Sequence, residues 1–270
     1  MNVLSLFDGI SCARVALSYV NIKVKDYYSC EIEKNAILIS KKNYPDIKQL
    51  GSVVDFKKEM INGKIDLLIG GSPCQDLSIA KKDRKGLDGE RSSLFWEYVS
   101  IKNELKPKYF ILENVASMLK KDKDIISEAI GCQPILFNAS LVSAQTRNRL
   151  FWTNIKFELP DDRCIILKDI LQPPAEVDER MVNKDKKAYT LTSSYTKISA
   201  SEKQIINSIE KKQRTMVQEN NIIRKLLPIE CERLQSLPDN YTEGIKNTNR
   251  YKVLGNAFNV NVIAHILSYI

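Results

Sequence analysis

The chain has 270 residues, of which 43% are hydrophobic and 27% charged, and this balance fits one large globular domain or one domain with a small insert. The apolar run 262–270 is interrupted by His265 and Ser268 and is too short to cross a bilayer, and the N-terminus opens directly into a strand-like segment. We therefore expect neither a membrane span nor a secretory signal.

The cysteine and histidine content excludes several classes of site. Six cysteines occur without a Cys-x-x-Cys pair, and His265 is the single histidine. This pattern argues against a zinc site, a disulfide framework and catalysis by a histidine base, so we expect no metal and a reducing cytoplasm. The 41 Lys and Arg residues against 33 Asp and Glu give a formal charge of +8, which favours a polyanionic partner but equally fits a solvated lysine-rich surface.

The first half of the chain alternates strand-like and helix-like segments, which predicts a sheet of parallel strands with crossover helices. The predicted elements are a strand at 3–7, a helix at 11–20, a strand at 26–31, a helix at 32–43 closed by Pro45, and a buried strand at 65–69. A helix from Ser92 or Ser93 to Leu105 and strands at 108–114, 134–138 and 150–154 follow. Together they predict a Rossmann-like, doubly wound sheet.

Two stretches break this alternation. Residues 71–93 form a polar connection that is too long for a routine loop, which indicates function or disorder. From about residue 155 to 244 the alternation is lost, and we interpret this stretch as a second, smaller unit that ends in a helix beginning at Pro228. The last segment, 256–270, is apolar enough to pack on the sheet.

Ligands of open α/β sheets bind beyond the carboxyl ends of the strands, so the residues there deserve inspection. Gly9 follows the first strand and allows close approach to the backbone, although a single glycine often only makes a turn. Glu31 ends the second strand and is placed to accept two ribose hydroxyls, although it also fits a solvated surface charge.

A thiol, a carboxylate and two guanidiniums are also predicted at this edge of the sheet. Cys74 follows Gly70-Gly71-Ser72-Pro73 at the end of a buried strand, which distinguishes it from an inert buried cysteine. Glu113 ends another strand, and Arg147 and Arg149 point the same way if their segment is extended. Such a site could attack a polarised ring, with nearby positive charge favouring the thiolate.

At these residues the sequence resembles a known family. Pro73-Cys74-Gln75, Glu113-Asn114-Val115, Gln145-x-Arg147-x-Arg149 and Gly255-Asn256-Ala257, in that order, are similar to the motifs of the cytosine-5 DNA methyltransferases. The stretch 71–86 is similar to the catalytic loop of the eukaryotic de novo enzymes in the runs 76–79 and 84–86. The resemblance covers most of 1–154 and 224–270. It implies a class I methyltransferase fold, with a catalytic domain of 1–154 plus 248–270 and a small target-recognition domain of 155–247.

The resemblance also implies a site for S-adenosylmethionine, which would leave as S-adenosylhomocysteine. Two departures from the family pattern stand out: Ser11 and Cys12 replace glycines of the first turn, and Ser52 replaces an acidic residue, for which Asp55 is a candidate substitute. The implied cofactor-binding residues are Phe7, Asp8, Gly9, Ile10, Ser11, Glu31, Ile32, Ser52, Val53, Pro73, Leu94, Asn256, Ala257 and Phe258.

In the implied mechanism Cys74 adds to carbon 6 of a flipped-out cytosine, Glu113 holds the amine and ring nitrogen, Arg149 grips the carbonyl oxygen and Arg147 orients Glu113. Basic residues of the long connection would contact phosphates, and hydroxyls of the insert would contact base edges or phosphates. The implied DNA-binding residues are Gln75, Ser78, Ile79, Ala80, Lys81, Lys82, Arg84, Lys85, Arg91, Gln145, Thr190, Leu191, Thr192 and Ser193.

Three other functions fit part of the pattern. A transfer RNA cytosine methyltransferase would share the motifs, but its hallmark Cys-Phe-Thr run does not occur in the sequence. A catalytically inactive DNA-binding relative is expected to lose the thiol or the carboxylate, both of which are kept here. A small-molecule methyltransferase leaves Cys74 and the basic loop without a role. The expected partners are double-stranded DNA and a cognate restriction endonuclease, and the expected form is a monomer in a bacterial or phage-infected cell.

Overall fold

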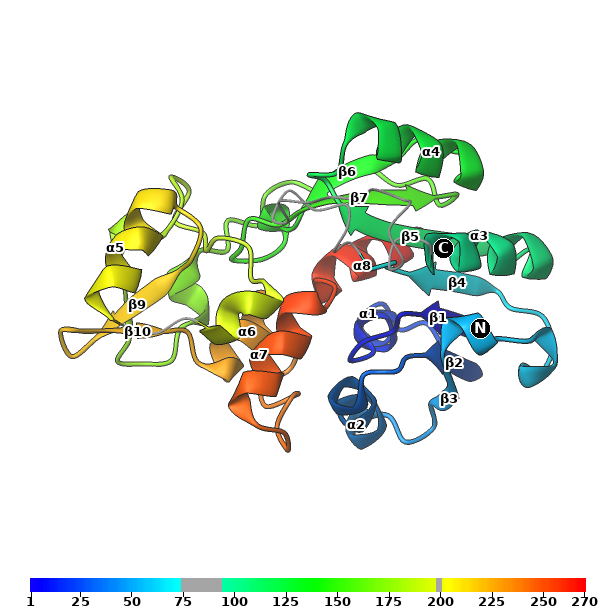
Figure 1. The fold of residues 1–270 in the computed structure, drawn as a ribbon, viewed down its shortest axis with the longest axis horizontal. Helices are drawn as coiled ribbons and strands as arrows, with labels where there is room; N and C mark the ends of the chain where they lie inside the picture. The colour runs from blue at the N-terminus through cyan, green and yellow to red at the C-terminus, as the bar shows by residue number, and fades with distance from the viewer. Residues whose placement is uncertain (74–93, 198–200) are drawn as a thin grey trace. The chain divides into compact units, whose positions relative to one another are not determined.

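The computed structural model describes residues 1–73, 94–197 and 201–270. These residues form two compact units, which Figure 1 traces in the colours of the chain. Unit 1 comprises 1–137, 148–158 and 266–270, and unit 2 comprises 138–147 and 159–265. The domain bounds implied by the family resemblance differ from these units at 138–147, 155–158 and 248–265. The functional division into catalytic and recognition domains stays a prediction.

The described strands of unit 1 form a seven-stranded sheet in the order β3-β2-β1-β4-β5-β7-β6. Strands β1 to β5 run parallel, and β7 pairs antiparallel with β5. The prediction of a mostly parallel, doubly wound α/β sheet is confirmed. The strands are β1 (Asn2–Leu6), β2 (Asp26–Cys30), β3 (Lys48–Gly51), β4 (Leu67–Gly70), β5 (Tyr109–Val115), β6 (Ile135–Asn138) and β7 (Asn148–Thr153).

Local chemistry sets the ends of the helices of unit 1. The side chain of Glu33 accepts a hydrogen bond from the Ala36 amide at 2.8 Å and so caps α2. Gly131 ends α4 in the left-handed region, with φ of 87°. The helices are α1 (Cys12–Tyr19), α2 (Lys34–Asn43), α3 (Leu94–Leu105) and α4 (Lys120–Ile130).

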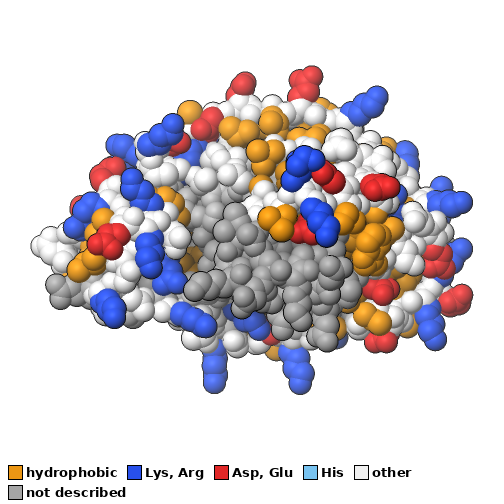
Figure 2. Space-filling model, turned by 45° about the horizontal axis from the view of Figure 1, so that its top comes forward, with side chains coloured by type: hydrophobic (Ala, Val, Ile, Leu, Met, Phe, Trp, Pro, Cys, Tyr) orange, Lys and Arg blue, Asp and Glu red, His pale blue; other side chains and the backbone are white. Residues whose placement is uncertain are grey.

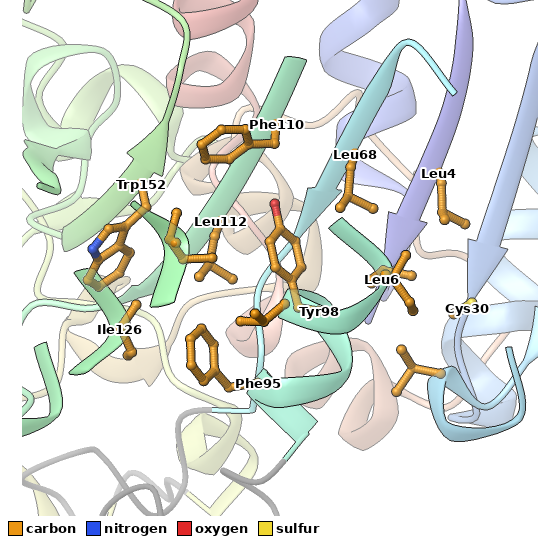
Figure 3. Packing of buried hydrophobic residues seen from close by; sticks show 14 of the residues in the cluster. Leu4, Leu6, Cys30, Leu68, Phe95, Tyr98, Phe110, Leu112, Ile126 and Trp152 are labelled. Atoms are coloured by element: carbon orange, nitrogen blue, oxygen red, sulfur yellow. The ribbon is translucent and has the colours of Figure 1, made fainter. Parts of the chain in front are cut away.

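The core beneath the sheet explains why its central strands β1, β4 and β5 are largely apolar. Alternate residues of β1 and β5, Leu4, Leu6 and Leu112, pack with Phe95 and Tyr98 of α3 (Figure 3). The residues between them in β1, Val3 and Ser5, are also fully buried. Both faces of the central strands are therefore covered, as expected of parallel strands.

Unit 2 contains a three-stranded antiparallel sheet in the order β10-β9-β8 and four helices among its described residues. Its helix α6 begins at Pro228, as predicted, and Glu230 reaches back to the Leu227 amide at 2.7 Å. The elements are β8 (Glu176–Val177), β9 (Met216–Glu219), β10 (Ile222–Lys225), α5 (Glu202–Lys211), α6 (Pro228–Leu234), α7 (Asn247–Asn256) and α8 (Val260–Leu267), the last of which ends in unit 1.

Ser127 on α4 provides a test of the core. Its hydroxyl accepts a hydrogen bond from the indole nitrogen of the fully buried Trp152 at 3.0 Å and donates to the Lys123 carbonyl. Because Ser127→Ala leaves the indole N–H without this acceptor, we expect the free energy of unfolding to fall by about 1–3 kcal/mol in urea denaturation followed by tryptophan fluorescence.

Ser18→Ala is the matched control, because the Ser18 hydroxyl also donates to the carbonyl four residues earlier but is exposed. We expect this variant to stay within about 0.5 kcal/mol of the parent protein. Equal losses in the two variants would show that the indole contact contributes nothing.

Candidate active site

The turn after β1 is held in an unusual backbone conformation. Phe7, Gly9 and Ser11 all have positive φ, at 56°, 60° and 60°. A Cβ added to Gly9 would meet no atom within 4 Å, so its left-handed conformation, not crowding, favours glycine there. The open space at Gly9 leaves its backbone accessible to a ligand.

Buried hydrogen bonds to Asp8 fix this turn from within. One oxygen of Asp8 accepts from the Tyr27 hydroxyl at 2.6 Å, and the other accepts from Ser11 at 2.5 Å and Ser29 at 3.0 Å. Burial raises the pKa of Asp8, while these hydroxyl donors act to lower it. The side chains of Asp8, Ile10 and Ser11, each predicted to bind cofactor, are thus buried and shape the turn instead of facing outward.

Glu31, directly after β2, binds the same turn. Its carboxylate accepts hydrogen bonds from the amides of Gly9 at 2.7 Å and of Ile32 and Glu33 at 2.8 Å. Beside it the Ile32 side chain is 72% exposed, an unusual position for a large apolar group. Further along the edge, Ser52 accepts from the Val54 amide and Val53 is buried.

Glu113 and Arg149 meet on one face of the β5–β7 pair. Arg149 lies opposite Val115 in the antiparallel register, which places it diagonally from Glu113. The Arg149 Nε atom is 2.7 Å from Glu113 Oε1, and the two side chains are only 17% and 13% exposed. This partly buried ion pair fixes the orientation of the carboxylate at the edge where β5 ends.

Asn114 is a functional candidate that sequence reasoning missed. Its amide group is buried, donates to the Ser72 hydroxyl at 3.1 Å and accepts from the Val115 amide at 2.8 Å. It therefore ties the end of β5 to the segment that leads into Cys74. The available signal was a second polar residue, directly after Glu113, at the end of a strand that is otherwise largely apolar.

Arg147 does not accompany Arg149. It lies in unit 2, is 4% exposed, and donates to the carbonyls of Leu191 at 2.8 Å and Ala257 at 2.9 Å. The ion pair of Glu113 is made by Arg149. The role of Arg147 in orienting Glu113 stays a prediction. Gln145 is fully buried and bonds within unit 2, which leaves no face of it open to DNA.

The other predicted residues differ in exposure. In unit 2, Thr192 and Asn256 are exposed, Thr190, Ser193 and Phe258 are half-buried, and Leu191 and Ala257 are buried. In unit 1, Pro73 and Leu94 are half-buried. Cys74, Gln75, Ser78, Ile79, Ala80, Lys81, Lys82, Arg84, Lys85 and Arg91 lie outside the described residues.

The described cysteines are free thiols, and most are poorly suited to nucleophilic attack. Burial raises the pKa of Cys30 to about 12, and the electrostatic effect of Asp8 and Glu31 acts in the same direction. Burial also raises the pKa of Cys132 and of Cys231. The thiolate is the nucleophilic form, so these groups are weak candidates beside the predicted Cys74.

The described surface carries charged side chains of both signs. On the face shown in Figure 2, Lys and Arg side chains are interspersed with Asp and Glu. Within the described ranges, no three His, Cys, Asp or Glu side chains are grouped to hold a metal ion, and no helix is long and apolar enough to span a membrane.

The family model of the C-5 cytosine-specific DNA methylases matches residues 1–172 and 145–270. The chain belongs to this family. The match includes Glu113 and Arg149, the turn 7–11 and the segment that precedes Cys74.

Relatives within the cytosine-specific methylases include phage and bacterial proteins. The chain is 30% identical over 226 residues to the orphan methyltransferase M.SPRI of Bacillus phage SPR, covering 78% of this chain and 50% of that protein. It is 24% identical over 310 residues to the type II methyltransferase M.HhaI of Haemophilus parahaemolyticus, covering 98% and 93%. The chain thus spans half the length of the phage relative.

Solved structures share the fold. The Entamoeba histolytica methyltransferase EhMeth matches with a TM-score of 0.72 at 18% identity, covering 100% of this chain and 97% of that one. The S. pombe Dnmt2 methyltransferase matches with a TM-score of 0.68 at 17% identity, covering 99% and 97%. These likenesses show a common architecture across nearly the whole chain.

The Asp8 network predicts a pH-dependent stability. The pKa of Asp8 is raised above 3.8 in the folded protein, so its contribution to stability is present at low pH and is lost as pH rises through the folded-state pKa. We expect Asp8→Asn to lower the free energy of unfolding by about 1–3 kcal/mol at acidic pH, and the gap to the parent protein to narrow as pH rises.

Urea denaturation of both proteins at several pH values measures this gap. Asp185→Asn, at an exposed position, is the control and should show a gap near zero at every pH. A gap for Asp8→Asn that widened with rising pH would reverse the sign and refute the assignment.

Proposed function

We propose that the chain transfers a methyl group from S-adenosylmethionine to carbon 5 of a cytosine in duplex DNA. The observation that carries the proposal is the ion pair of Glu113 and Arg149 at the edge of the sheet, joined through Asn114 to the segment that precedes Cys74. Membership of the cytosine-specific DNA methylase family supports the same reaction.

The residues after β1 and β2 fit the cofactor. The space at Gly9 admits a ligand to the backbone, the Glu31 carboxylate is held in place to accept ribose hydroxyls, and exposed Ile32 offers apolar surface to the adenine ring. The bound sulfonium would supply the electrophilic methyl group. In this proposal the Asp8 side chain maintains the conformation of the turn and does not itself contact the ligand.

The chain's own residues would activate the ring. Carbon 5 of cytosine is a weak nucleophile, so the Cys74 thiolate would form a bond to carbon 6 and push electrons toward ring nitrogen 3. Glu113 would share a proton with that nitrogen, while Arg149 holds the carbonyl oxygen at position 2 and the carboxylate itself. Once carbon 5 carries the methyl group, loss of its proton returns the electron pair that breaks the bond to sulfur.

The reaction requires an extruded base, at a cost of a few kcal/mol. We propose that the predicted basic residues between Lys81 and Arg91 hold the phosphates around it. The proposed partners are duplex DNA and a cognate restriction endonuclease, and the proposed form is a cytoplasmic monomer. The relatives include a protein named as a type II methyltransferase and another named as an orphan methyltransferase.

The experiment is incubation of the protein with tritiated S-adenosylmethionine and mixed-sequence DNA, followed by bisulfite sequencing to locate methylated cytosines. Unmodified transfer RNA is included as a second substrate. We expect label in DNA at a defined sequence. Label in transfer RNA alone would replace DNA with RNA as the substrate, and no transfer to either would refute the proposal.

Cys74→Ser tests the nucleophile. We expect this variant to lose turnover while it still binds S-adenosylhomocysteine, because a hydroxyl is a far weaker nucleophile than a thiolate. A duplex with 5-fluorocytosine at the located cytosine should trap the parent protein covalently and leave the variant free on a denaturing gel. Full activity in the variant would exclude the mechanism.

Glu113→Gln tests the carboxylate. Glutamine keeps the shape but cannot donate the proton to ring nitrogen 3, so we expect kcat to fall by about 10²–10⁴-fold with cofactor affinity unchanged. Glu128→Gln, an exposed position on α4, is the matched control and should keep the parent rate. A Glu113→Gln variant with the parent kcat would remove this carboxylate from the chemistry.

A further inference from the structure

Arg147 connects two segments of unit 2 that are far apart in sequence. Its Nη1 atom donates to the Leu191 carbonyl at 2.8 Å, and Nη2 donates to the carbonyls of Ala257 at 2.9 Å and Gly255 at 3.3 Å. The guanidinium is buried, so these charge-assisted bonds do not compete with water. The position of residue 191 is thereby fixed relative to the end of α7.

Leu191 is held on its amide side as well. The Gln145 side chain accepts a hydrogen bond from the Leu191 amide at 3.3 Å, and the Thr190 hydroxyl donates to the Thr146 carbonyl at 2.6 Å. The Thr146 amide donates to the Ala188 carbonyl at 2.8 Å. Residues 145–147 therefore form a strip along which residues 188–191 are bonded through backbone and side chains.

Gly255 brings the end of α7 directly against the next residues. A Cβ at this position would lie 2.2 Å from the Ser193 nitrogen and 2.5 Å from the Thr192 oxygen, distances that backbone atoms cannot accommodate. Only glycine permits this approach. The Thr192–Ser193 peptide thus lies directly against the backbone of α7, next to the Leu191 carbonyl that Arg147 binds.

The hydroxyls above this support are open. Thr192 and Ser194 are exposed and hydrogen-bonded to each other at 2.9 Å, while Leu191 and Tyr195 on either side are buried. The Tyr195 hydroxyl donates to the Thr215 carbonyl at 2.7 Å, which anchors the far end. The exposed hydroxyls of Thr192 and Ser194 therefore lie between buried residues whose positions are fixed by hydrogen bonds.

We propose that Arg147 is a positioning residue for sequence discrimination, which sets the geometry of the hydroxyls at 192–194 against the DNA. This inference rests on the proposed function, and it gives Arg147 a role separate from the Glu113–Arg149 pair. Hydrogen-bond readout of bases depends on donor and acceptor positions within a few tenths of an ångström. A change in the buried residues that support the segment should therefore reduce discrimination between DNA sequences before it abolishes turnover.

The test compares kcat/KM on the duplex located by bisulfite sequencing with kcat/KM on duplexes that each carry one changed base pair beside the target cytosine. A single mismatch normally costs a DNA-binding protein about 5- to 150-fold. A lysine ammonium is a single compact donor group that does not span the carbonyls of Leu191 and Ala257 as the guanidinium does. We therefore expect Arg147→Lys to reduce the discrimination ratio, kcat/KM on the located duplex divided by kcat/KM on a changed duplex, by about ten-fold.

Two comparison variants separate positioning from catalysis and from folding. Arg149→Lys should lower kcat by the same factor on every duplex and leave the ratio unchanged. Lys252→Gln, an exposed change on α7, should leave both rate and ratio unchanged. If part of the Arg147→Lys protein is unfolded, the rates on all duplexes fall by the same factor and the discrimination ratio does not change. A change in that ratio therefore indicates a positioning role.

Gly255→Ala provides the second variant, because its Cβ pushes the end of α7 away from the Thr192–Ser193 peptide while the Arg147 guanidinium is kept. We expect it to lower the ratio in the same direction, and it decides the question if Arg147→Lys does not fold. A parent-like ratio in either folded variant overturns the inference. A parent protein that methylates no duplex would instead overturn the proposed function, and the inference with it.

Discussion

The antiparallel pairing of β7 with β5 is the constraint on which the proposed site depends. Because β7 runs against the parallel strands, its first residues lie at the edge where β5 ends, and Arg149 comes within 2.7 Å of Glu113. A parallel strand in this place would present its first residues at the opposite edge. The antiparallel direction of β7 therefore places Arg149, near the start of β7, beside Glu113, near the end of β5.

Buried polar side chains provide the remaining order, and each acts on the backbone beside a candidate functional residue. Asp8 holds the turn around Gly9, Asn114 holds the segment before Cys74, and Arg147 holds the carbonyl before Thr192. Burying such groups is costly unless they are hydrogen-bonded, and here the cost is offset by bonds that fix loops. The order of the neighbouring backbone thus comes from buried polar groups.

The sequence predicted the central strands well, because a strand buried on both faces is a continuous apolar run. It missed β3, whose residues Lys48–Gly51 lie at the sheet edge and are not apolar, and it missed α7, whose polar sequence has no clear stripe. It also placed Arg147 and Arg149 at one site, since alternate residues of an extended segment face the same way. The chain passes from unit 2 to unit 1 between them, which periodicity cannot reveal.

Cys30 illustrates how burial in a paired strand makes a thiol inert. Cys30 is the last residue of β2, paired in register with Leu6 of β1, and burial beside Asp8 and Glu31 raises its pKa to about 12. Cys74 comes after β4 has already ended at Gly70, beyond the last residue that pairs with β1 and β5. The neighbours of Cys30 in the paired strand desolvate its thiol, and desolvation disfavours the charged, nucleophilic form. Cys132 and Cys231 lie outside the paired strands, and burial raises their pKa values as well, so it is burial, within or outside a strand, that makes a thiol inert.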